Sequence, residues 1–451
     1  MEYYNNIKKL KESLAIKDEK IGLKHNINNK APLLPFKTNK NADFDKGFNS
    51  LLGELSRLIS NNILDKEVEE STIIKSISEN VDMNKSDKVT FERLMEKFLF
   101  DQDNTIKVFH PHMFQYFKTK GKKEEDIALF IRDIFFNDVS DDLRSFFSKK
   151  NKNHILSKLV LSKLSYLKSE SKATVYINKL STISDIFYDD LTFLLNHKKY
   201  FMDNLDIFIA YYYFFYTLQL SLKLDKINEG DLTSIEKVYY TLDWERTSRS
   251  RKSYIRGYNF IRNIARTSLF AHINCLEHLN FLFDTSGASY KELNDLFISK
   301  SDEEKKELIK FLKIWIREYR KHRSLEAIEH ISNDYNQIIK ILFESLKAGI
   351  PDAAKTRYAY PIEAIGKKYF LKTRGSLGYM LNITQDFLLF LTAVAVKNER
   401  KALKSVFEEY EKRGVYFDRY SKEAVVLLLD KLNILDKKSD SGDAQYVKPI
   451  L

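Results

Sequence analysis

The sequence has little of what sheet-rich, disulfide-bonded or secreted proteins need. Only 13 of its 451 residues are glycine and six are proline, and no proline lies between His112 and Ile350. Because sheet proteins need many turn residues, this scarcity predicts long helices. The single cysteine, Cys275, excludes an intrachain disulfide and a cysteine-based zinc ribbon. Residues 1–6 lack the basic and then apolar pattern of a secretory signal, so we expect a cytoplasmic protein.

Long uncharged runs are scarce as well. The longest covers residues 207–222 and carries Tyr, Thr, Gln and Ser among its apolar side chains. A membrane-spanning helix needs about 20 mostly apolar residues. The run therefore predicts a buried core helix, and we expect no association with a membrane.

The spacing of apolar residues predicts an all-α fold made of multi-helix bundle domains. Helical patterns cover residues 44–63, 89–100, 124–136, 155–166 and 325–346, and Ser301 and Glu304 form the capping box of another helix. Four regions are predicted: an N-terminal helical region at 1–100 with a linker near 25–40, a central helical domain at 101–245, a basic helical domain at 246–397 and a C-terminal module at 398–451.

The C-terminal module is predicted to be a small winged-helix-like unit that ends in a β-hairpin. A helix over 398–412 stops at Gly414, a second helix covers 421–432, and residues 434–438 and 444–449 form two short strands. The second helix is apolar over 424–429 and the module is nearly neutral. Phosphate contact needs positive charge, which favours docking to protein over reading of DNA. Both roles stay open at this point.

Arginine is concentrated in one segment of a chain whose net charge is +11. Six of the 18 arginines lie within residues 246–266, and residues 246–276 contain no Asp or Glu. On one helix, Arg246, Arg249, Lys252 and Arg256 would form a single stripe, and Arg262 and Arg266 an i, i+4 pair. Arginine donates two hydrogen bonds to one phosphate, and the interleaved aromatics Tyr254, Tyr258 and Phe260 could stack on bases.

A second basic stretch over residues 355–379 combines cations with three glycines, Gly366, Gly375 and Gly378. Such glycines let the backbone approach a phosphate, but a loop between helices needs them equally. The predicted nucleic-acid contacts of the two stretches are Arg246, Arg249, Arg251, Lys252, Arg256, Arg262, Arg266, Lys367, Lys368, Lys372 and Arg374. The alternative is that these cations pair with carboxylates of the chain or of a partner.

The C-terminal tail resembles that of DptG, a subunit of the prokaryotic restriction machinery that discriminates DNA by its phosphorothioation. The matching residues are Gly414, Asp418, residues 433–435 and residues 439–447, about a tenth of the chain. The resemblance implies a helical accessory subunit of an antiviral defence complex, beside ATPase and nuclease-like partner subunits, with no active-site motif to carry over. It makes the tail a predicted partner-binding surface, with Ser439, Asp440, Ser441, Gly442, Asp443 and Tyr446.

Motifs for catalysis are incomplete. No nucleotide-binding P-loop occurs, and His272, Cys275 and His278 drift around a helix instead of converging on a metal. We therefore predict no catalytic residue, metal or cofactor. One enzymatic alternative remains, an all-helical ribonuclease of the HEPN type, which uses an arginine followed four to six residues later by a histidine. The candidate pairs are Arg266 with His272, Arg317 with His322, and Arg323 with His330.

The sequence thus predicts a non-catalytic subunit that engages DNA through backbone contacts, or acts as a scaffold, in a DNA-directed defence complex. A HEPN-like ribonuclease and a purely structural protein-docking subunit are the alternatives.

Overall fold

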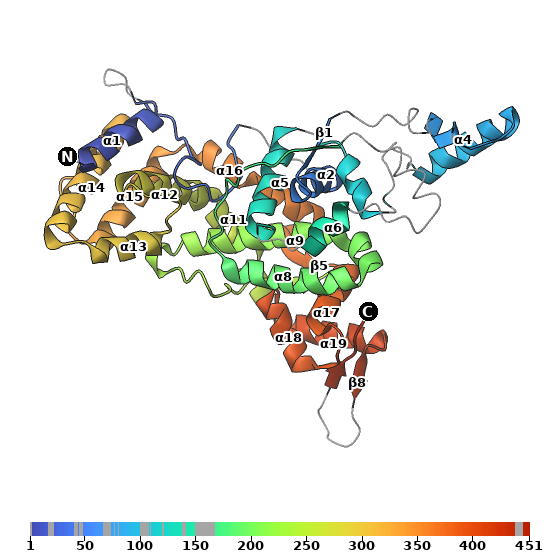
Figure 1. Ribbon diagram of the computed structural model, residues 1–451. Coiled ribbons are helices and arrows are strands. Elements are labelled where there is room, and N and C mark those ends of the chain that lie inside the picture. The colour runs from blue at the N-terminus through green and yellow to red at the C-terminus, as the bar shows by residue number, and fades with distance from the viewer. Residues whose placement is uncertain are drawn as a thin grey trace. The chain divides into compact units, whose positions relative to one another are not determined.

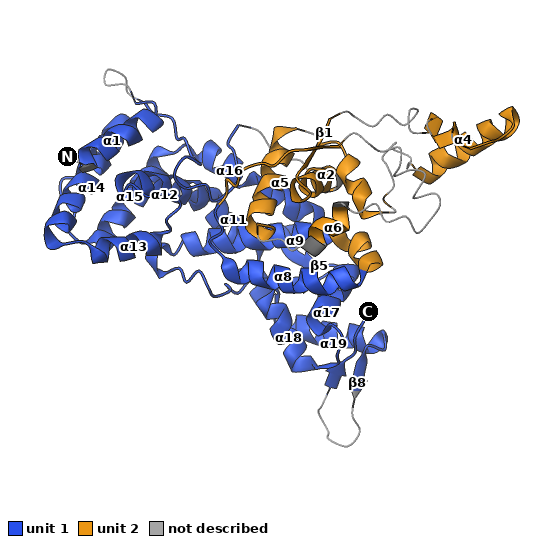
Figure 2. Ribbon diagram, viewed as in Figure 1, with its two compact units in different colours: residues 1–43, 177–197, 207–451 blue, residues 44–176, 198–206 orange. Residues whose placement is uncertain are grey.

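The structure is a computed structural model that describes residues 2–16, 22–39, 44, 48–65, 74–75, 77–79, 81–99, 108, 110–119, 121–137, 141–148, 167–437 and 445–451. The described chain is mainly helical with small sheets, as the sequence predicts, and forms two compact units (Figures 1 and 2). Unit 1 contains residues 1–43, 177–197 and 207–451, and unit 2 contains residues 44–176 and 198–206. The predicted division into four regions stays a prediction.

Unit 2 is a small helical unit with one two-stranded sheet. Its elements are α2 (Asn49–Ile59), β1 (Asn62–Leu64), α4 (Lys85–Leu99), η1 (Pro111–Tyr116), α5 (Lys122–Phe135), α6 (Asp141–Ser148) and β2 (Leu167–Ser169). The buried guanidinium of Arg57 on α2 donates to the carbonyls of Gln115 and Phe117 at 2.6 and 2.8 Å. This arginine therefore ties α2 to the end of η1. The expected helix over 155–166 lies outside the described residues.

Unit 1 contains the longest helix of the described chain, α9 (Lys198–Leu224), whose first residues belong to unit 2. Residues 208–224 are buried, which confirms the predicted core helix. Two of its tyrosine hydroxyls bond inside the protein as follows: Tyr212 donates to Asp190 at 2.5 Å, and Tyr216 accepts from the Lys179 amide at 2.9 Å. No described helix is long and apolar enough to cross a membrane.

The other helices of unit 1 surround α9 or form a second group with the N-terminus. They are α1 (Glu2–Ser13), α8 (Ser181–Asn196), α10 (Lys252–Ile255), α11 (Tyr258–Ile264), α12 (Phe270–Leu282), α13 (Tyr290–Ser299), α14 (Asp302–His322), α15 (Tyr335–Gly349), α16 (Asp352–Ile365), α17 (Gln385–Val396), α18 (Leu403–Lys412) and α19 (Arg419–Lys431). Figure 1 shows α1, α12, α14 and α15 grouped together. The predicted capping box of Ser301 and Glu304 is confirmed at the start of α14. Residues 325–334 are not helical, although a helix was expected there, because α14 ends at His322 and Asp334 caps a new helix.

Two small sheets complete unit 1. The first has the strand order β4-β5-β3-β7, from β3 (Tyr239–Leu242), β4 (Leu371–Thr373), β5 (Tyr379–Ile383) and β7 (Tyr416–Phe417); β3 runs parallel to β5 and β7, and β4 is antiparallel to β5. The second is antiparallel with the order β6-β9-β8, from β6 (Lys401–Ala402), β8 (Leu435–Lys437) and β9 (Gln445–Val447). Strands β8 and β9 confirm the two predicted C-terminal strands, and β6 was not predicted.

A buried ion pair joins the C-terminal elements to the long helices. Arg413, just after α18, donates to both carboxylate oxygens of Asp190 on α8 at 2.8 and 2.6 Å, and the two side chains are only 2% and 1% exposed. Gly414 then turns the chain with a φ of +77°, a conformation that glycine adopts without strain. Its Cα lies so close to Phe215 of α9 that a Cβ would collide with the ring. The predicted helix end at Gly414 is therefore confirmed.

Replacing Arg413 by Met is expected to lower the free energy of unfolding by about 3–5 kcal/mol, because Asp190 is left buried and unpaired. Urea denaturation followed by circular dichroism measures the loss. The matched control is Arg419→Met, since Arg419 pairs with Glu423 at 2.9 Å on the surface, where both side chains are exposed. We expect the control to leave the unfolding midpoint unchanged; equal effects of the two changes would contradict the structural role of the buried pair.

Candidate nucleic-acid interface

The arginine-rich segment folds around one of its own side chains. Arg251 is 8% exposed, and its Nε donates to Asp418 Oδ2 at 2.8 Å while Nη2 donates to Glu245 Oε1 at 3.0 Å. Its Nη1 donates to the carbonyl of Arg246 at 2.9 Å. Ser421 on α19 closes the cluster, since its hydroxyl donates to Glu245 and accepts from Arg251 at 2.8 Å in each case. Residues 242–251 therefore form a loop that is pinned to the start of α19.

In this cluster, the hydrogen bonds and opposite charges around Asp418 and Arg251 favour the ionised form of each group. Burial alone would raise the pKa of Asp418, but hydrogen bonds from Arg251 and from the Ser421 amide hold it below its ordinary value. Burial would likewise lower the pKa of Arg251, but its bonds to Asp418 and the charge of Glu245 raise it. One guanidinium thus lies between two carboxylates, and the three groups together offer no spare positive charge.

The same loop is held from its other side by the second basic stretch. Arg374 donates to the carbonyls of Leu242 at 2.7 Å and Glu245 at 3.1 Å. Lys372 forms an ion pair with Asp243 at 2.9 Å. These two predicted nucleic-acid contacts have structural partners, and their role in the described chain is to hold the loop.

A hollow of about 1030 Å³ lies between this loop and the start of α19. We call it the basic groove. Its charged and aromatic lining consists of the cations Lys237, Arg246, Arg251, Lys252, Arg419 and Lys422, the acids Glu245, Glu411 and Asp418, and the rings of Tyr239, Trp244, Tyr416, Phe417 and Tyr420. Cations exceed acids two to one, and aromatic rings lie among them.

Four predicted contact residues remain exposed beside or in the groove: Arg246, Arg249, Lys252 and Arg256. None of the four forms an ion pair with any residue that the structure describes. The Lys252 ammonium lies 5.6 Å from the ring centre of Tyr239, and the Arg256 guanidinium lies 4.9 Å from that of Phe260. Their charges are therefore available to an external anion.

The predicted single helical stripe of these four residues is wrong. Residues 246–251 are a loop, and α10 is only four residues long. The loop forms because Arg251 draws the carbonyl of Arg246 and two carboxylates around its guanidinium. Tyr258, which was expected to stack on bases, is buried in the core.

Three further predicted contacts converge on one carboxylate. Arg262 on α11, Arg266 and Lys367 all pair with the buried Glu363 of α16, Arg262 at 3.6 Å and Lys367 at 2.7 Å. Arg266 and Lys367 each lie on a π-helical segment, η3 (Ala265–Leu269) and η4 (Gly366–Phe370). Burial alone would raise the pKa of Glu363, but bonds from Lys367 and Arg266 hold it below its ordinary value. Here three cations share one carboxylate, so internal pairing explains their placement but leaves the cluster with an excess of positive charge.

The remaining predicted contacts are Lys368 and the tail. Lys368 is exposed. Ser439, Asp440, Ser441, Gly442 and Asp443 lie outside the described residues. Tyr446 on β9 is half-buried, and the guanidinium of Arg400 lies 5.4 Å from its ring centre.

The histidines that suggested catalysis or metal binding lie apart in the core. His272 stacks on Phe343 at 4.0 Å between ring centres and bonds to the Tyr290 hydroxyl at 3.1 Å. His278 instead accepts from Trp315 at 3.3 Å, and burial lowers its pKa to about 3. Burial raises the pKa of Cys275 to about 12. The described residues contain no group of three acidic, histidine or cysteine side chains that could hold a metal.

The HEPN pairing of Arg266 with His272 is likewise not assembled. Arg266 pairs with Glu363, whereas His272 is fully buried beside Tyr290. Burial, outweighing the nearby Asp225, lowers the pKa of His272. Arg323 lies at the end of α14 and His330 in the non-helical stretch that follows, so one helix does not carry both. Arg317 and His322 do lie on α14.

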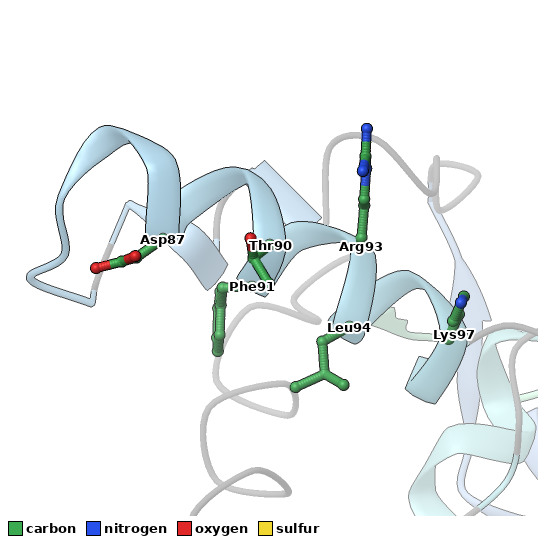
Figure 3. A pocket seen from close by; sticks show the side chains of 6 residues that line it. All are labelled: Asp87, Thr90, Phe91, Arg93, Leu94 and Lys97. Atoms are coloured by element: carbon green, nitrogen blue, oxygen red, sulfur yellow. The ribbon is translucent and has the colours of Figure 1, made fainter.

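A second hollow of about 470 Å³ lies along α4 in unit 2 (Figure 3). All six of its lining residues belong to α4, and Figure 3 shows Phe91 and Leu94 on one side of the helix with Arg93 on the other. A surface formed by one helix encloses no ligand, so we do not consider it a site.

Sequence reasoning missed four groove residues that come from three separate places in the chain: Lys237, Trp244, Arg419 and Tyr420. Trp244 lies next to the arginine-rich segment, and its position there was a usable signal. Arg419 and Tyr420 gave none, because the C-terminal module is nearly neutral as a whole and only its fold brings them to the groove.

Comparison with protein-family models and with curated protein sequences gives no match. The function is therefore argued from the geometry of the groove.

Replacing Arg251 by Met is expected to reduce the free energy of unfolding by about 3–5 kcal/mol, because Asp418 and Glu245 lose their shared partner.

The stabilisation that Asp418 contributes should depend on pH. The folded-state pKa of Asp418 lies below the ordinary value of 3.8, so its stabilisation is complete above that pH and is lost as the pH falls through the folded-state value. Denaturation measured at pH 7 and at lower pH should show the difference between wild type and Asp418→Asn shrinking in acid. A constant difference would contradict the ion pair.

Proposed function

We propose that the protein is a non-catalytic nucleic-acid-binding subunit that contacts the phosphate backbone of DNA through the basic groove. The observation that carries this proposal is the set of four exposed cations, Arg246, Arg249, Lys252 and Arg256, of which Arg246 and Lys252 line the concave and aromatic groove. By contrast, Arg251, Lys372 and Arg374 bond to carboxylates or carbonyls of the described chain, and Arg262, Arg266 and Lys367 share Glu363. A cation that has no internal partner costs nothing to desolvate on folding and remains free to neutralise a phosphate.

The surroundings of the four cations support a phosphate ligand. The loop that carries Arg246 and Arg249 is bonded through its backbone to Arg251 and Arg374, so the points from which the two side chains extend are set before a ligand arrives. Preorganised charge lowers the entropic cost of binding. Contacts of this kind position a protein on nucleic acid and carry little sequence information, so binding is expected to be largely independent of sequence.

The C-terminal elements contribute the other wall of the groove, and we propose that they form a winged-helix-like module. The order α17, β6, α18, β7, α19, β8 and β9, with β9 between β6 and β8, supports this reading, although β7 pairs with β3 of the other sheet. Such modules present the first residues of their last helix to nucleic acid, and Arg419, Tyr420 and Lys422 at the start of α19 line the groove. The apolar residues of α19 then serve the core, as Val425 and Leu429 do.

Membership of a phosphorothioation-dependent restriction complex, beside ATPase and nuclease-like subunits, is part of the proposal. The resemblance to DptG at Gly414, Asp418 and the tail supports it. On this view the groove holds DNA while residues 439–446 bind a partner subunit that supplies the chemistry.

Changing Arg246 and Arg249 together to Glu is expected to weaken DNA binding without lowering thermal stability. For the wild type, log K against log salt should fall with a slope of roughly −4 if the four cations each neutralise one phosphate of a duplex, and the variant should lose about half of that slope. Fluorescence anisotropy at several salt concentrations and a melting curve measure both quantities.

The matched control for this change is Lys306→Glu with Lys310→Glu, two exposed cations on α14 that do not line the groove. The control alters the net charge by the same amount and should leave the slope nearly unchanged. Equal losses in the two variants would reduce the effect to net charge alone and overturn the groove as the site. A large drop in melting temperature of the Arg246 and Arg249 variant would show that these residues are structural.

Replacing Asp440 and Asp443 by Ala is expected to abolish co-purification with the partner subunits encoded beside this chain, while DNA binding by the isolated protein is retained. Affinity purification with each neighbouring subunit measures the first effect and anisotropy the second. The control is Glu326→Ala with Glu329→Ala, two exposed carboxylates between α14 and α15. Unchanged assembly of the tail variant would contradict the tail as the partner-binding surface.

A further inference from the structure

Two large aromatic side chains on the wall of the basic groove face solvent. Trp244 is 46% exposed and Tyr420 is 63% exposed. Exposure of such rings is unfavourable in water, and aromatic groups gathered on a surface mark binding sites more often than scattered apolar residues do. The other tryptophan, Trp315, is fully buried and donates from its indole to His278. The chain therefore buries one indole in its core and presents the other at the groove.

Both exposed rings are mounted on fixed supports. Trp244 belongs to the loop whose carbonyls accept from Arg374 and whose Asp243 binds Lys372. Tyr420 lies at the start of α19, and the buried guanidinium of Arg251 lies 5.2 Å from its ring centre. The guanidinium lies on the protein side of the Tyr420 ring, and the ring remains exposed to the groove.

The groove has room for more than a single ring. At about 1030 Å³ it reaches the upper end of the ~300–1,000 Å³ typical of pockets that hold a drug-sized ligand. Glu411 and Lys422 also border a neighbouring hollow of about 590 Å³, which Lys404 and Tyr446 line further on. The two hollows therefore adjoin, which suits an extended chain better than one mononucleotide.

We propose that the basic groove binds unpaired nucleotides of a nucleic-acid strand, whose bases stack on Trp244 and Tyr420 while Arg246 and Lys252 bind the phosphates. This inference rests on the proposed function and specifies its ligand. Stacking on aromatic rings does not distinguish between bases, since every base has a π face. Bases in an intact duplex are already stacked on one another, so these rings give the protein a preference for single-stranded segments.

The experiment compares three ligands with the full-length protein. The first is a thymidine oligomer of about 15 nucleotides, a length near the upper site size of single-strand binding folds. The other two are an abasic oligomer of equal length and the corresponding duplex. Because Trp315 is buried, quenching of tryptophan fluorescence reports on Trp244. We expect the thymidine oligomer to quench the fluorescence and to bind about tenfold or more tightly than the abasic oligomer, which keeps the phosphates and lacks the bases.

Variants separate stacking from phosphate contact. Trp244→Ala and Tyr420→Ala should each weaken thymidine-oligomer binding by roughly 5- to 100-fold and leave the abasic oligomer unaffected, whereas Trp244→Phe should retain most of the affinity. Tyr188→Ala is the matched control, since Tyr188 on α8 is also exposed but does not line the groove. It should bind all three ligands like the wild type.

Three outcomes would overturn the inference in different ways. The first outcome is that all three ligands bind equally, that Trp244→Ala has no effect, and that the Arg246 and Arg249 double variant loses binding. The groove then binds phosphates alone, so the proposed function stands and the stacking inference fails. If no nucleic acid binds at physiological salt, both fail. Quenching by an acidic peptide with no effect of any oligomer would instead assign the groove to a protein partner.

Discussion

The ion pair between Arg413 and Asp190 is the constraint on which the functional end of unit 1 depends. It is almost completely buried, and Asp190 also accepts from Tyr212 of α9, so α8, α9 and the end of α18 meet at one carboxylate. The chain leaves this point through Gly414, whose lack of a side chain lets it pass Phe215, and continues as β7 beside β3. Asp418 follows directly and meets Arg251. The position of the groove therefore follows from where Arg413 is anchored.

Arginine has two separate tasks in this protein, and its surroundings decide between them. Arg251, Arg374 and Arg413 each donate several hydrogen bonds to oxygen atoms inside the fold, where the planar guanidinium can hold several chain segments at once. Arg246 and Arg249 extend from the loop that these anchors hold and are exposed. The anchors hold the backbone of the loop, and the exposed pair extends its charge into solvent from there. A groove built in this way suits the binding of an anion.

The histidines illustrate why spacing alone is a weak guide to a site. His272, Cys275 and His278 all lie on α12, a helix that is buried on every side. His272 stacks on Phe343 and bonds to Tyr290, which also contacts Cys275, whereas His278 bonds to Trp315. An all-buried helix directs residues at i, i+3 and i+6 around the core instead of toward one point. The same burial lowers the pKa of His278 to about 3 and keeps it neutral across the physiological range.

Local rules were sufficient for the elements that local interactions stabilise. The scarcity of glycine and proline predicted a mainly helical chain, the capping box placed the start of α14, the uncharged run identified the buried part of α9, and Gly414 marked the end of α18. The acid-free composition of residues 246–276 also marked a segment that lines the basic groove through Arg246, Arg251 and Lys252. Composition could not tell which cations are free, because the carboxylates that neutralise Arg251 and Arg266 lie 167 and 97 residues away. Only the tertiary structure decides that pairing, because a buried charge takes whichever partner the fold brings within hydrogen-bond distance. The same pairing explains why the predicted helix is interrupted and why Trp244 and Tyr420 line one groove.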